Sequence, residues 1–458
     1  MGSWSDNVSS RWGRRKPFIV AGIIGLTLSI LTLAWTRELI TGSKQVDVIP
    51  STKLRTAVIC FATFWIYALN VAIQPVQAGI RSLIVEYCPN SQQSQASTYA
   101  SVMQGIGNIV GYLFAFGVSP YISSGRLIPF QILAIFASTV LSATVAISCL
   151  TISEEPCPPL ESEETSNRRP LSKLRALLWT YRDMPRNIRK VFHVQFLAWM
   201  GWFPFLYYST TYVGEFYAGK RIFTYLVMHP KDQSGDYSDN QDPTPNIAQE
   251  AIRYGTFASF LFAVVTFTFN LILSGLLACF STSRCPKHAP LSKQEAIVQA
   301  WRYSHLLFAL LMFSTLFVHS EAAATAIVAL AGLSWALTLF APFAILGYEL
   351  APTRRSQRRR SSSQSTESLI SSSEGEDAND EALIPAADQE NRTGAIIGLH
   401  NVAISLPQIL AALACSAIYA AAKALHISDG TGWVLRAGGL AALGAAWLCA
   451  GFDEQANV

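Results

Sequence analysis

The sequence predicts an all-α polytopic membrane protein with about ten transmembrane helices, and two features carry that prediction. Hydrophobic residues make up 51% of the 458 positions and charged residues only 14%, whereas a soluble chain normally carries roughly a quarter charged residues. The apolar residues are also gathered into blocks of about 20, the length that crosses a bilayer as a helix. The lipid bilayer is therefore an expected partner. The net charge of +4 comes from basic loops and does not indicate a nucleic-acid partner.

Ten apolar blocks predict the transmembrane helices, four of them before the polar stretch 151–190 and six after it. Their edges follow from the first and last apolar residues of each block. The expected spans are 18–36, 57–85, 97–118, 127–150, 191–213, 255–281, 301–319, 322–348, 394–424 and 432–450.

The distribution of Lys and Arg predicts the orientation of these spans. Cytoplasmic loops carry an excess of basic residues, and here these residues gather in 1–17, 151–190, 282–300 and 349–393. Both termini are therefore expected in the cytoplasm. The plasma membrane is the expected location, with the vacuolar membrane as the alternative. The sequence indicates no metal site and leaves the oligomeric state unknown.

The spacing of the spans predicts three regions. Residues 1–150 are expected to form an N-terminal helix bundle, 151–190 a cytoplasmic linker, and 191–458 a C-terminal bundle of six helices. Within the last region, 214–254 is predicted to be a partly ordered outer cap. Residues 353–391 begin with arginines and continue in serines and acids, which predicts a disordered cytoplasmic loop. This loop is interpreted as a solvated tether, with phosphorylation of its serines as the alternative.

Polar side chains inside an apolar helix are costly in lipid and therefore mark candidate functional residues. The second span carries four of them on one helical face: Asn70, Gln74, Gln77 and Arg81. Such a face can line a wet cavity and bind hydroxyl groups, and the alternative is hydrogen bonding between helices. Four aligned polar residues that include an arginine favour the cavity. Glu86, nearer the cytoplasmic end, titrates if it is buried and is the candidate for proton coupling.

Two further spans each supply a pair of binding candidates, whose members lie one or two turns apart on the helix. These are Gln104 and Asn108 in the third span, and Asn401 and Gln408 in the ninth. Gly107 and Gly111 of the third span have the small-residue spacing that predicts a close helix contact.

The fifth span ends in a dense aromatic run around Pro204, which predicts a kinked helix. Aromatic faces can stack on the apolar faces of sugar rings, while hydroxyl groups bind the ring edges. Trp202 and Tyr208 are accordingly candidates for substrate binding. The alternative is an aromatic belt at the membrane interface.

The first seventeen residues form a pattern of glycines, one acid and basic residues directly before the first apolar block. Its members are Gly2, Asp6, Arg11, Gly13, Arg14 and Arg15. Glycines let helix ends approach closely, the Asp can cap a helix, and the cations mark a cytoplasmic face. An ordinary basic flank is the alternative.

These motifs together resemble the major facilitator superfamily, in the sucrose transporter group (glycoside-pentoside-hexuronide:cation symporter-like) with its fungal members. The opening pattern resembles the loop between the second and third helices of that group, Gln77–Leu83 resembles the fourth helix, and Trp199–Phe205 the seventh. The resemblance implies a twelve-helix fold in two bundles, so we expect ten helices here, without the first two. It makes 1–150 equivalent to helices 3–6. It also implies that the opening pattern latches a cytoplasmic gate.

The resemblance implies a secondary active transporter of sucrose or related α-glucosides that works by alternating access. Sugar:proton symport is expected, with no cofactor besides the proton. The sugar is expected between the second-span polar face and the fifth-span aromatics. Plant members carry an Asp where this chain has Asn70, an amide that cannot exchange a proton. Glu86 is therefore the remaining candidate for proton coupling.

The alternatives are a non-transporting sugar receptor or regulator, or an inactive truncated isoform, on the same scaffold. An enzyme is disfavoured, and no catalytic residue is predicted. Glu38 and Asp47 are an unconvincing pair for a polytopic glycosyltransferase, and the sequence lacks a nucleotide-binding loop.

Overall fold

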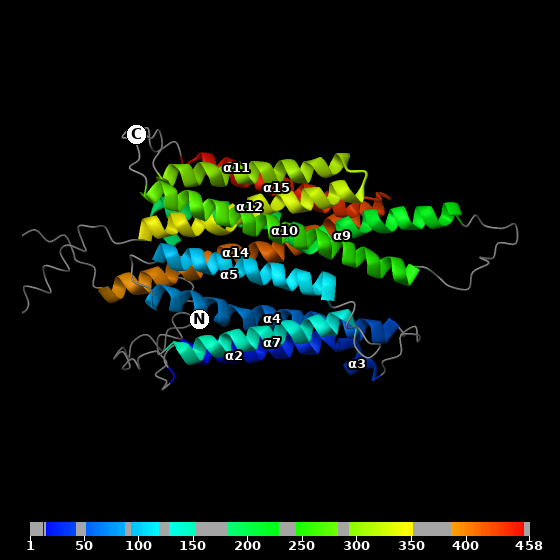
Figure 1. The fold of residues 1–458 in the computed structure, drawn as a ribbon, viewed down its shortest axis with the longest axis horizontal. Helices are drawn as coiled ribbons and strands as arrows, with labels where there is room; N and C mark the ends of the chain where they lie inside the picture. The colour runs from blue at the N-terminus through cyan, green and yellow to red at the C-terminus, as the bar shows by residue number, and fades with distance from the viewer. Residues whose placement is uncertain are drawn as a thin grey trace, which may run out of the picture. The chain divides into compact units, whose positions relative to one another are not determined.

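The computed structural model describes residues 12, 15–42, 52–87, 93–118, 128–152, 181–182, 184–228, 244–282, 293–350 and 386–452. Within these ranges the chain is helical apart from short connections, and they contain no strand (Figure 1). The predicted all-α class is confirmed. Of the predicted loops, 151–190 and 353–391 lie largely outside the described residues.

The first half of the chain forms four long helices and two short elements. Each of the long ones coincides with a predicted span to within a few residues. They are α2 (Lys16–Ala34), the short α3 (Thr36–Thr41), α4 (Thr52–Tyr87), α5 (Gln93–Leu113) with its π-helical end η1 (Phe114–Val118), and α7 (Pro129–Thr151).

The second half forms six long helices, again at the predicted positions. They are α9 (Arg186–Met228), α10 (Thr244–Thr282), α11 (Lys293–Ser314) with the 3-10 turn η2 (Thr315–Phe317), α12 (Glu321–Leu350), α14 (Ala386–Ala424) and α15 (Gly430–Ala450). Interior prolines occur in four of the chain's long helices: Pro75, Pro204, Pro342 and Pro407.

Nine of these helices are long and apolar enough to cross a membrane, counted over the described residues. The exception is α9, whose predicted span 191–213 is a helix but is not among the nine. Its phenols, indoles and hydroxyl groups give it a more polar composition than its neighbours. That α9 also crosses the membrane, which would make ten spans, therefore stays a prediction.

The region 214–254, predicted to be a partly ordered outer cap, is helical over most of its length, because α9 continues to Met228 and α10 begins at Thr244. Its position outside the membrane stays a prediction. Side-chain contacts hold these extensions. The Lys220 ammonium lies 2.6 Å from a Glu321 carboxylate oxygen, and the Tyr217 hydroxyl donates to Glu250 at 2.6 Å. Sequence composition alone could not reveal these pairs, because they join helices that are distant in the chain. Residues 229–243 lie outside the described ranges.

The chain divides into two compact units that interleave along the sequence. The first contains Met1–Asn167, Thr210–Ser281 and His319–Gly332, and the second contains Arg168–Ser209, Thr282–Val318 and Leu333–Val458. The division into regions 1–150, 151–190 and 191–458 stays a prediction.

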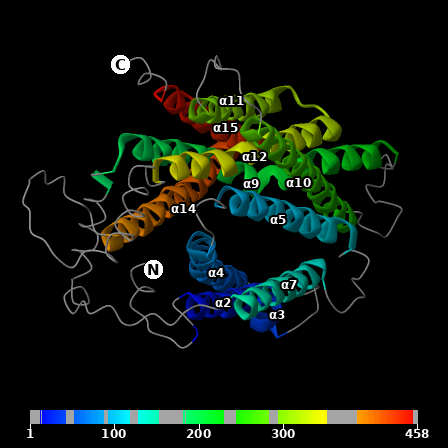
Figure 2. The same cartoon turned by 60° about the vertical axis from the view of Figure 1, so that its left-hand side comes forward.

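In the first unit, α2 packs against α4 and α7, which lie beside it in Figures 1 and 2. The shared core contains Ile19, Ile23, Val76, Leu83 and Val145. At the end of α7 nearest α3, the Gln131 amide donates to a Glu38 carboxylate oxygen at 2.7 Å. Glu38 therefore forms a hydrogen bond that joins α3 to α7.

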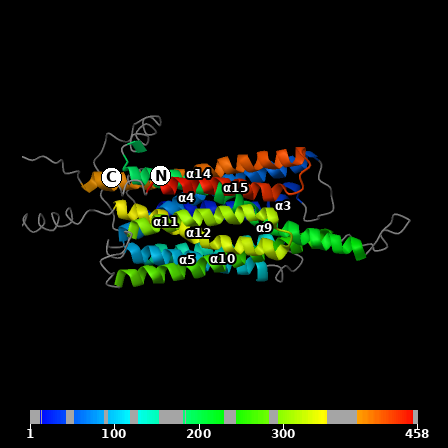
Figure 3. The ribbon, with the colours of Figure 1, turned by 90° about the horizontal axis from the view of Figure 1, so that it is seen from above.

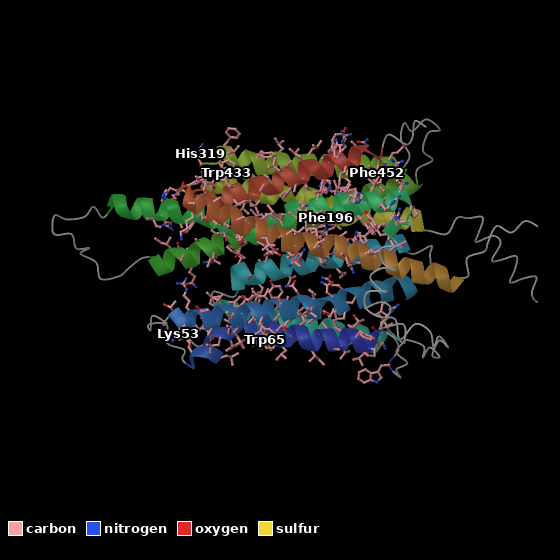
Figure 4. All side chains as sticks on the ribbon, turned by 180° about the vertical axis from the view of Figure 1, so that it is seen from behind. Lys53, Trp65, Phe196, His319, Trp433 and Phe452 are labelled. Carbon is pink, nitrogen blue, oxygen red and sulfur yellow. The ribbon has the colours of Figure 1, made fainter. Side chains whose placement is uncertain are left out.

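In the second unit, α11 packs along α15 (Figure 3), and α9 approaches α15 very closely at Gly201 and Gly438. A Cβ atom placed on Gly201 would lie 2.6 Å from the carbonyl oxygen of Gly438, and one on Gly438 would lie 2.8 Å from that of Gly201. Only glycine fits such a backbone contact. Trp433 and Phe452 mark the two ends of α15 in Figure 4.

Candidate functional site

The predicted polar face of α4 is present as one stripe of a continuous helix. Asn70 and Gln74 are half-buried and Gln77 is exposed. The Asn70 amide donates to the carbonyl of Ile66 in its own helix at 2.8 Å, which fixes its orientation. The backbones of Arg81 and Glu86 belong to α4, but their side chains lie outside the described part.

The pair on α5 is also accessible, with Gln104 exposed and Asn108 half-buried. The predicted close contact at Gly107 and Gly111 is not found in the described part of the chain, where a Cβ on either glycine would meet no neighbouring atom within 4 Å. The contact lies at Gly105 instead, where a Cβ would come within 2.5 Å of Phe267. The small-residue spacing identified the right helix but the wrong face of it.

Trp202 lies in the core of the second unit and is 0% exposed. Its indole N–H donates to the Thr338 hydroxyl at 3.1 Å. The Trp202 ring centroid is 4.0 Å from that of Phe308 and 4.8 Å from that of Trp335. In this conformation the indole of Trp202 therefore holds α9 against α11 and α12. A contact between Trp202 and sugar stays a prediction.

The structure brings together a second face of α9 and the middle of α14. Tyr207 is exposed, and its hydroxyl forms a hydrogen bond with the Gln408 side chain. The neighbouring Tyr208 ring lies 5.2 Å from that of Tyr419. Asn401 lies two turns before Gln408 on α14 and is half-buried. Phenols and amides thus meet on one surface of the second unit, and both kinds of group suit a polyhydroxylated ligand.

Sequence reasoning missed Tyr207, although a usable signal was present. From Phe205 to Tyr212, the buried residues of α9 recur at helical spacing: Phe205, Ser209 and Tyr212. Tyr207 lies outside that stripe. A periodicity analysis within the run would have separated the packing face from the accessible face.

Most of the opening pattern lies outside the described residues, namely Gly2, Asp6, Arg11, Gly13 and Arg14. Arg15 is described. It is half-buried at the start of α2, where its carbonyl accepts from the N–H groups of Phe18 and Ile19. The structure of this turn suits a helix start, and the gate role of the pattern stays a prediction.

Arg436 on α15 is a buried charge that the sequence analysis did not consider. It is 6% exposed, and its guanidinium lies 2.5 Å from a carboxylate oxygen of Asp429. It also donates to the hydroxyl and the carbonyl of Thr315, both at 3.1 Å. Asp429 in turn caps α15 by accepting from the N–H of Gly432 at 2.9 Å. An arginine inside a predicted span was the signal, and its satisfied contacts indicate a structural role.

A cavity of about 420 Å³ lies in the first unit, between the extension of α9 and the start of α12. Its lining residues are Glu215, Phe216, Gly219, Lys220, His319, Ser320 and Glu321. The hydrogen bond to Glu321 raises the pKa of the Lys220 ammonium above its ordinary value. Among the described residues, no three His, Cys, Asp or Glu side chains are placed to hold a metal ion.

Comparisons with known proteins agree with this architecture. The sequence is 28% identical to the general alpha-glucoside permease of Schizosaccharomyces pombe, over 98% of this chain and 82% of the permease. It is 29% identical to the sucrose transport protein SUC4 of Arabidopsis thaliana, over 48% of this chain and 45% of that protein. The fold resembles the xylose transporter XylE of E. coli with a TM-score of 0.50 and 12% identity, over 98% of this chain and 82% of that one.

Family assignment follows from a match that covers most of the chain. The sequence model of the Major Facilitator Superfamily matches residues 1–371. The helical architecture and the α-glucoside and sucrose relatives point the same way. This chain therefore belongs to the Major Facilitator Superfamily, as an integral membrane protein of a transporter family and not an enzyme.

Proposed function

We propose that the chain is a secondary active transporter of sucrose or related α-glucosides. The observation that carries the proposal is the similarity to the alpha-glucoside permease, which extends over 98% of the chain. The plant sucrose transport proteins support the same substrate class over about half of their length. We further propose that it is a fungal protein of the plasma membrane or the vacuolar membrane, with both termini in the cytoplasm.

The chemistry of the second unit supports a sugar ligand. Tyr207 and Gln408 already share a hydrogen bond, so a hydroxyl group of the ligand can replace one partner without leaving a polar group unsatisfied. Tyr208 offers a ring face beside Tyr419, and Asn401 offers a second amide. We propose that these side chains bind the sugar in this unit, with Trp202 supporting α9 from behind.

The first unit is proposed to contribute amide groups. Asn70, Gln74 and Gln77 line one stripe of α4, and Gln104 and Asn108 add two more amides from α5. Amides both donate and accept, as sugar hydroxyls do, and they suit recognition without charge. Arg81 belongs to the same stripe by spacing and is proposed to supply a fixed positive charge.

Transport is proposed to be driven by protons and to work by alternating access between the regions 1–150 and 191–458. Asn70 cannot carry the proton, because an amide does not titrate in the physiological range. Glu86 is therefore the proposed coupling residue. The opening pattern from Gly2 to Arg15 is proposed to latch the cytoplasmic side.

The test is uptake of radiolabelled sucrose and maltose by the purified full chain in proteoliposomes, with and without an inward proton gradient. We expect uptake that the gradient increases and an uncoupler reduces to simple equilibration. A Glu86→Gln variant should lose the gradient's effect while it still equilibrates sugar. Sugar binding with no uptake under any gradient would instead favour a receptor and overturn the proposal.

A further inference from the structure

We propose that Arg253 is a gating residue that closes a contact between α5 and α10 at the end of these helices predicted to face outside. This contact must open for sugar to enter, so the inference rests on the proposed function. Arg253 is half-buried and lies inside the candidate membrane span Ile247–Leu273 of α10. A charge in that position is costly unless a specific partner satisfies it.

One such partner is the last turn of α5. The Nε–H group of Arg253 donates to the carbonyl oxygen of Phe116 at 3.3 Å, and its guanidinium carbon lies 5.2 Å from the Phe116 ring centroid. The Phe116 ring also packs on Phe257 of α10, with the two centroids 5.1 Å apart. One arginine thus holds both the backbone and the side chain of Phe116.

The Phe116 carbonyl needs such a partner because of where it lies. It belongs to η1, the π-helical stretch that ends α5 at Val118. Carbonyls in the last turn of a helix have no N–H donor within the helix, and they carry the negative end of its dipole. Arg253 therefore caps α5 from a different helix. This is a polar bond at a helix end, which can break and reform without unfolding either helix.

The same short element is anchored on its other side. Phe114 stacks on Phe136 of α7, with ring centroids 3.9 Å apart and planes 8° apart. Phe114 thus ties η1 to a helix of the region 1–150, whereas Phe116 ties it to a helix of the region 191–458. Helices α5 and α10 lie beside each other in Figures 2 and 3, and their contact extends to Gly105 and Phe267.

These contacts make η1 the point where two regions expected to move apart are joined. In alternating access the outer ends of α5 and α10 must separate when the substrate path opens outward. Arg253 stabilises the closed arrangement, so weakening its bond raises the population of the open one. A ligand that binds from outside then finds more of the competent state, and its apparent affinity increases.

The transport test compares Arg253→Ala, Arg253→Lys and the control Arg221→Ala in the full chain. Arg221 carries the same charge on an exposed part of α9. We expect Arg253→Ala to lower the external KM by roughly threefold to tenfold, the factor that one hydrogen bond typically supplies. The KM of Arg253→Lys should lie between those of wild type and Arg253→Ala, and the KM of Arg221→Ala should match that of wild type. A higher KM together with a lower Tm for Arg253→Ala would indicate a merely structural role and overturn the proposal.

A second test does not depend on transport. Phe116→Cys with Phe257→Cys keeps the carbonyl that Arg253 caps, and a short cross-linker that reductants cleave can join the two thiols. We expect cross-linking without sugar, a rate several-fold lower when Arg253→Ala is added, and loss of uptake until the link is cleaved. Variants that carry only Phe116→Cys or only Phe257→Cys control for cross-linking to the native cysteines. If wild type takes up no sugar, the proposed function fails while the cross-linking rates still test the Arg253 contact. Equal rates with and without Arg253 would overturn the proposal.

Discussion

The indole N–H of Trp202 donates to the hydroxyl of Thr338 at 3.1 Å, deep in the second unit. The Thr338 hydroxyl in turn donates to the carbonyl of Ser334 at 2.9 Å. This chain of bonds crosses from α9 to α12 where both helices contain a proline nearby. It holds the aromatic run in one orientation, with Trp202 turned inward and Tyr207 turned outward.

Removing the hydroxyl of Thr338 is expected to destabilise the fold. In Thr338→Val the buried N–H of Trp202 loses its acceptor, which costs about 1–3 kcal/mol. Truncating the ring in Trp202→Ala should cost more, about 3–5 kcal/mol, because a large cavity remains. Thermal unfolding in detergent measures both. Trp447→Ala, at a position 75% exposed, is the control. Equal losses at Trp202 and Trp447 would refute the packing role of Trp202.

The close approach of α9 and α15 makes a prediction for Gly438. A methyl group there would meet the Gly201 carbonyl at 2.8 Å, so Gly438→Ala forces two backbones apart and should cost about 1–3 kcal/mol. Gly107→Ala is the matched control, because its Cβ meets open space. That change should be neutral or stabilising by about 0.5–1 kcal/mol. Unfolding midpoints compare the two, and a neutral Gly438→Ala would contradict the described approach.

The buried Arg436 and its partner Asp429 predict unequal single-variant effects. Asp429→Asn leaves a guanidinium in the core with weaker compensation, whereas Arg436→Met leaves a carboxylate that is already 41% exposed. Losing one partner of a buried pair typically costs about 3–5 kcal/mol, and we expect Asp429→Asn to approach that value more closely. A double-mutant cycle on thermal stability measures the coupling. Additive losses would show that the two side chains act independently.

The pair of Lys220 and Glu321 predicts a dependence on pH and salt. The pKa of Lys220 is raised above 10.5 by the hydrogen bond to Glu321, so its contribution is complete below pH 10.5 and is lost as the pH rises through the raised pKa. The Tm difference between wild type and Lys220→Met should therefore shrink at alkaline pH. It should also be small and fall with added salt, because the lysine is exposed. A difference that grows at alkaline pH would contradict the pairing.

Sequence patterns were sufficient for much of the fold because apolar blocks of bilayer length leave few alternatives. The helices α2, α4 and α7 lie where their apolar runs predicted them. Contacts between helices that are distant in the sequence could not be predicted from it. Nothing in the apolar pattern predicts that Glu321 would meet Lys220 and lengthen α9, or that Gly105 and not Gly107 would meet a neighbour.

In the candidate site, too, the sequence identified individual residues but not their partners. Polar residues such as Gln408 could be identified from the sequence, because any amide inside an apolar helix is unusual. Their partners could not, since the bond from Tyr207 to Gln408 joins helices separated by most of the C-terminal half. Trp202 was identified by its motif, but its burial depends on how Phe308 and Trp335 pack around it.

The binding surface on α9 and α14 predicts a specific loss of sugar affinity. Tyr207→Phe removes the hydroxyl that contacts Gln408 and should raise KM about tenfold with little change in Tm, because Tyr207 is exposed. Tyr303→Phe, on an exposed position of α11, is the control and should leave KM unchanged. An unchanged KM in Tyr207→Phe would exclude that hydroxyl from sugar recognition.

The central claim, that this chain carries sugar across the membrane, is tested most directly by counterflow. Proteoliposomes are loaded with unlabelled maltose or sucrose and diluted into a trace of the labelled sugar, with no proton gradient. We predict a transient accumulation of label inside, which a carrier produces and a receptor does not. Label that binds the protein but never accumulates would contradict the account.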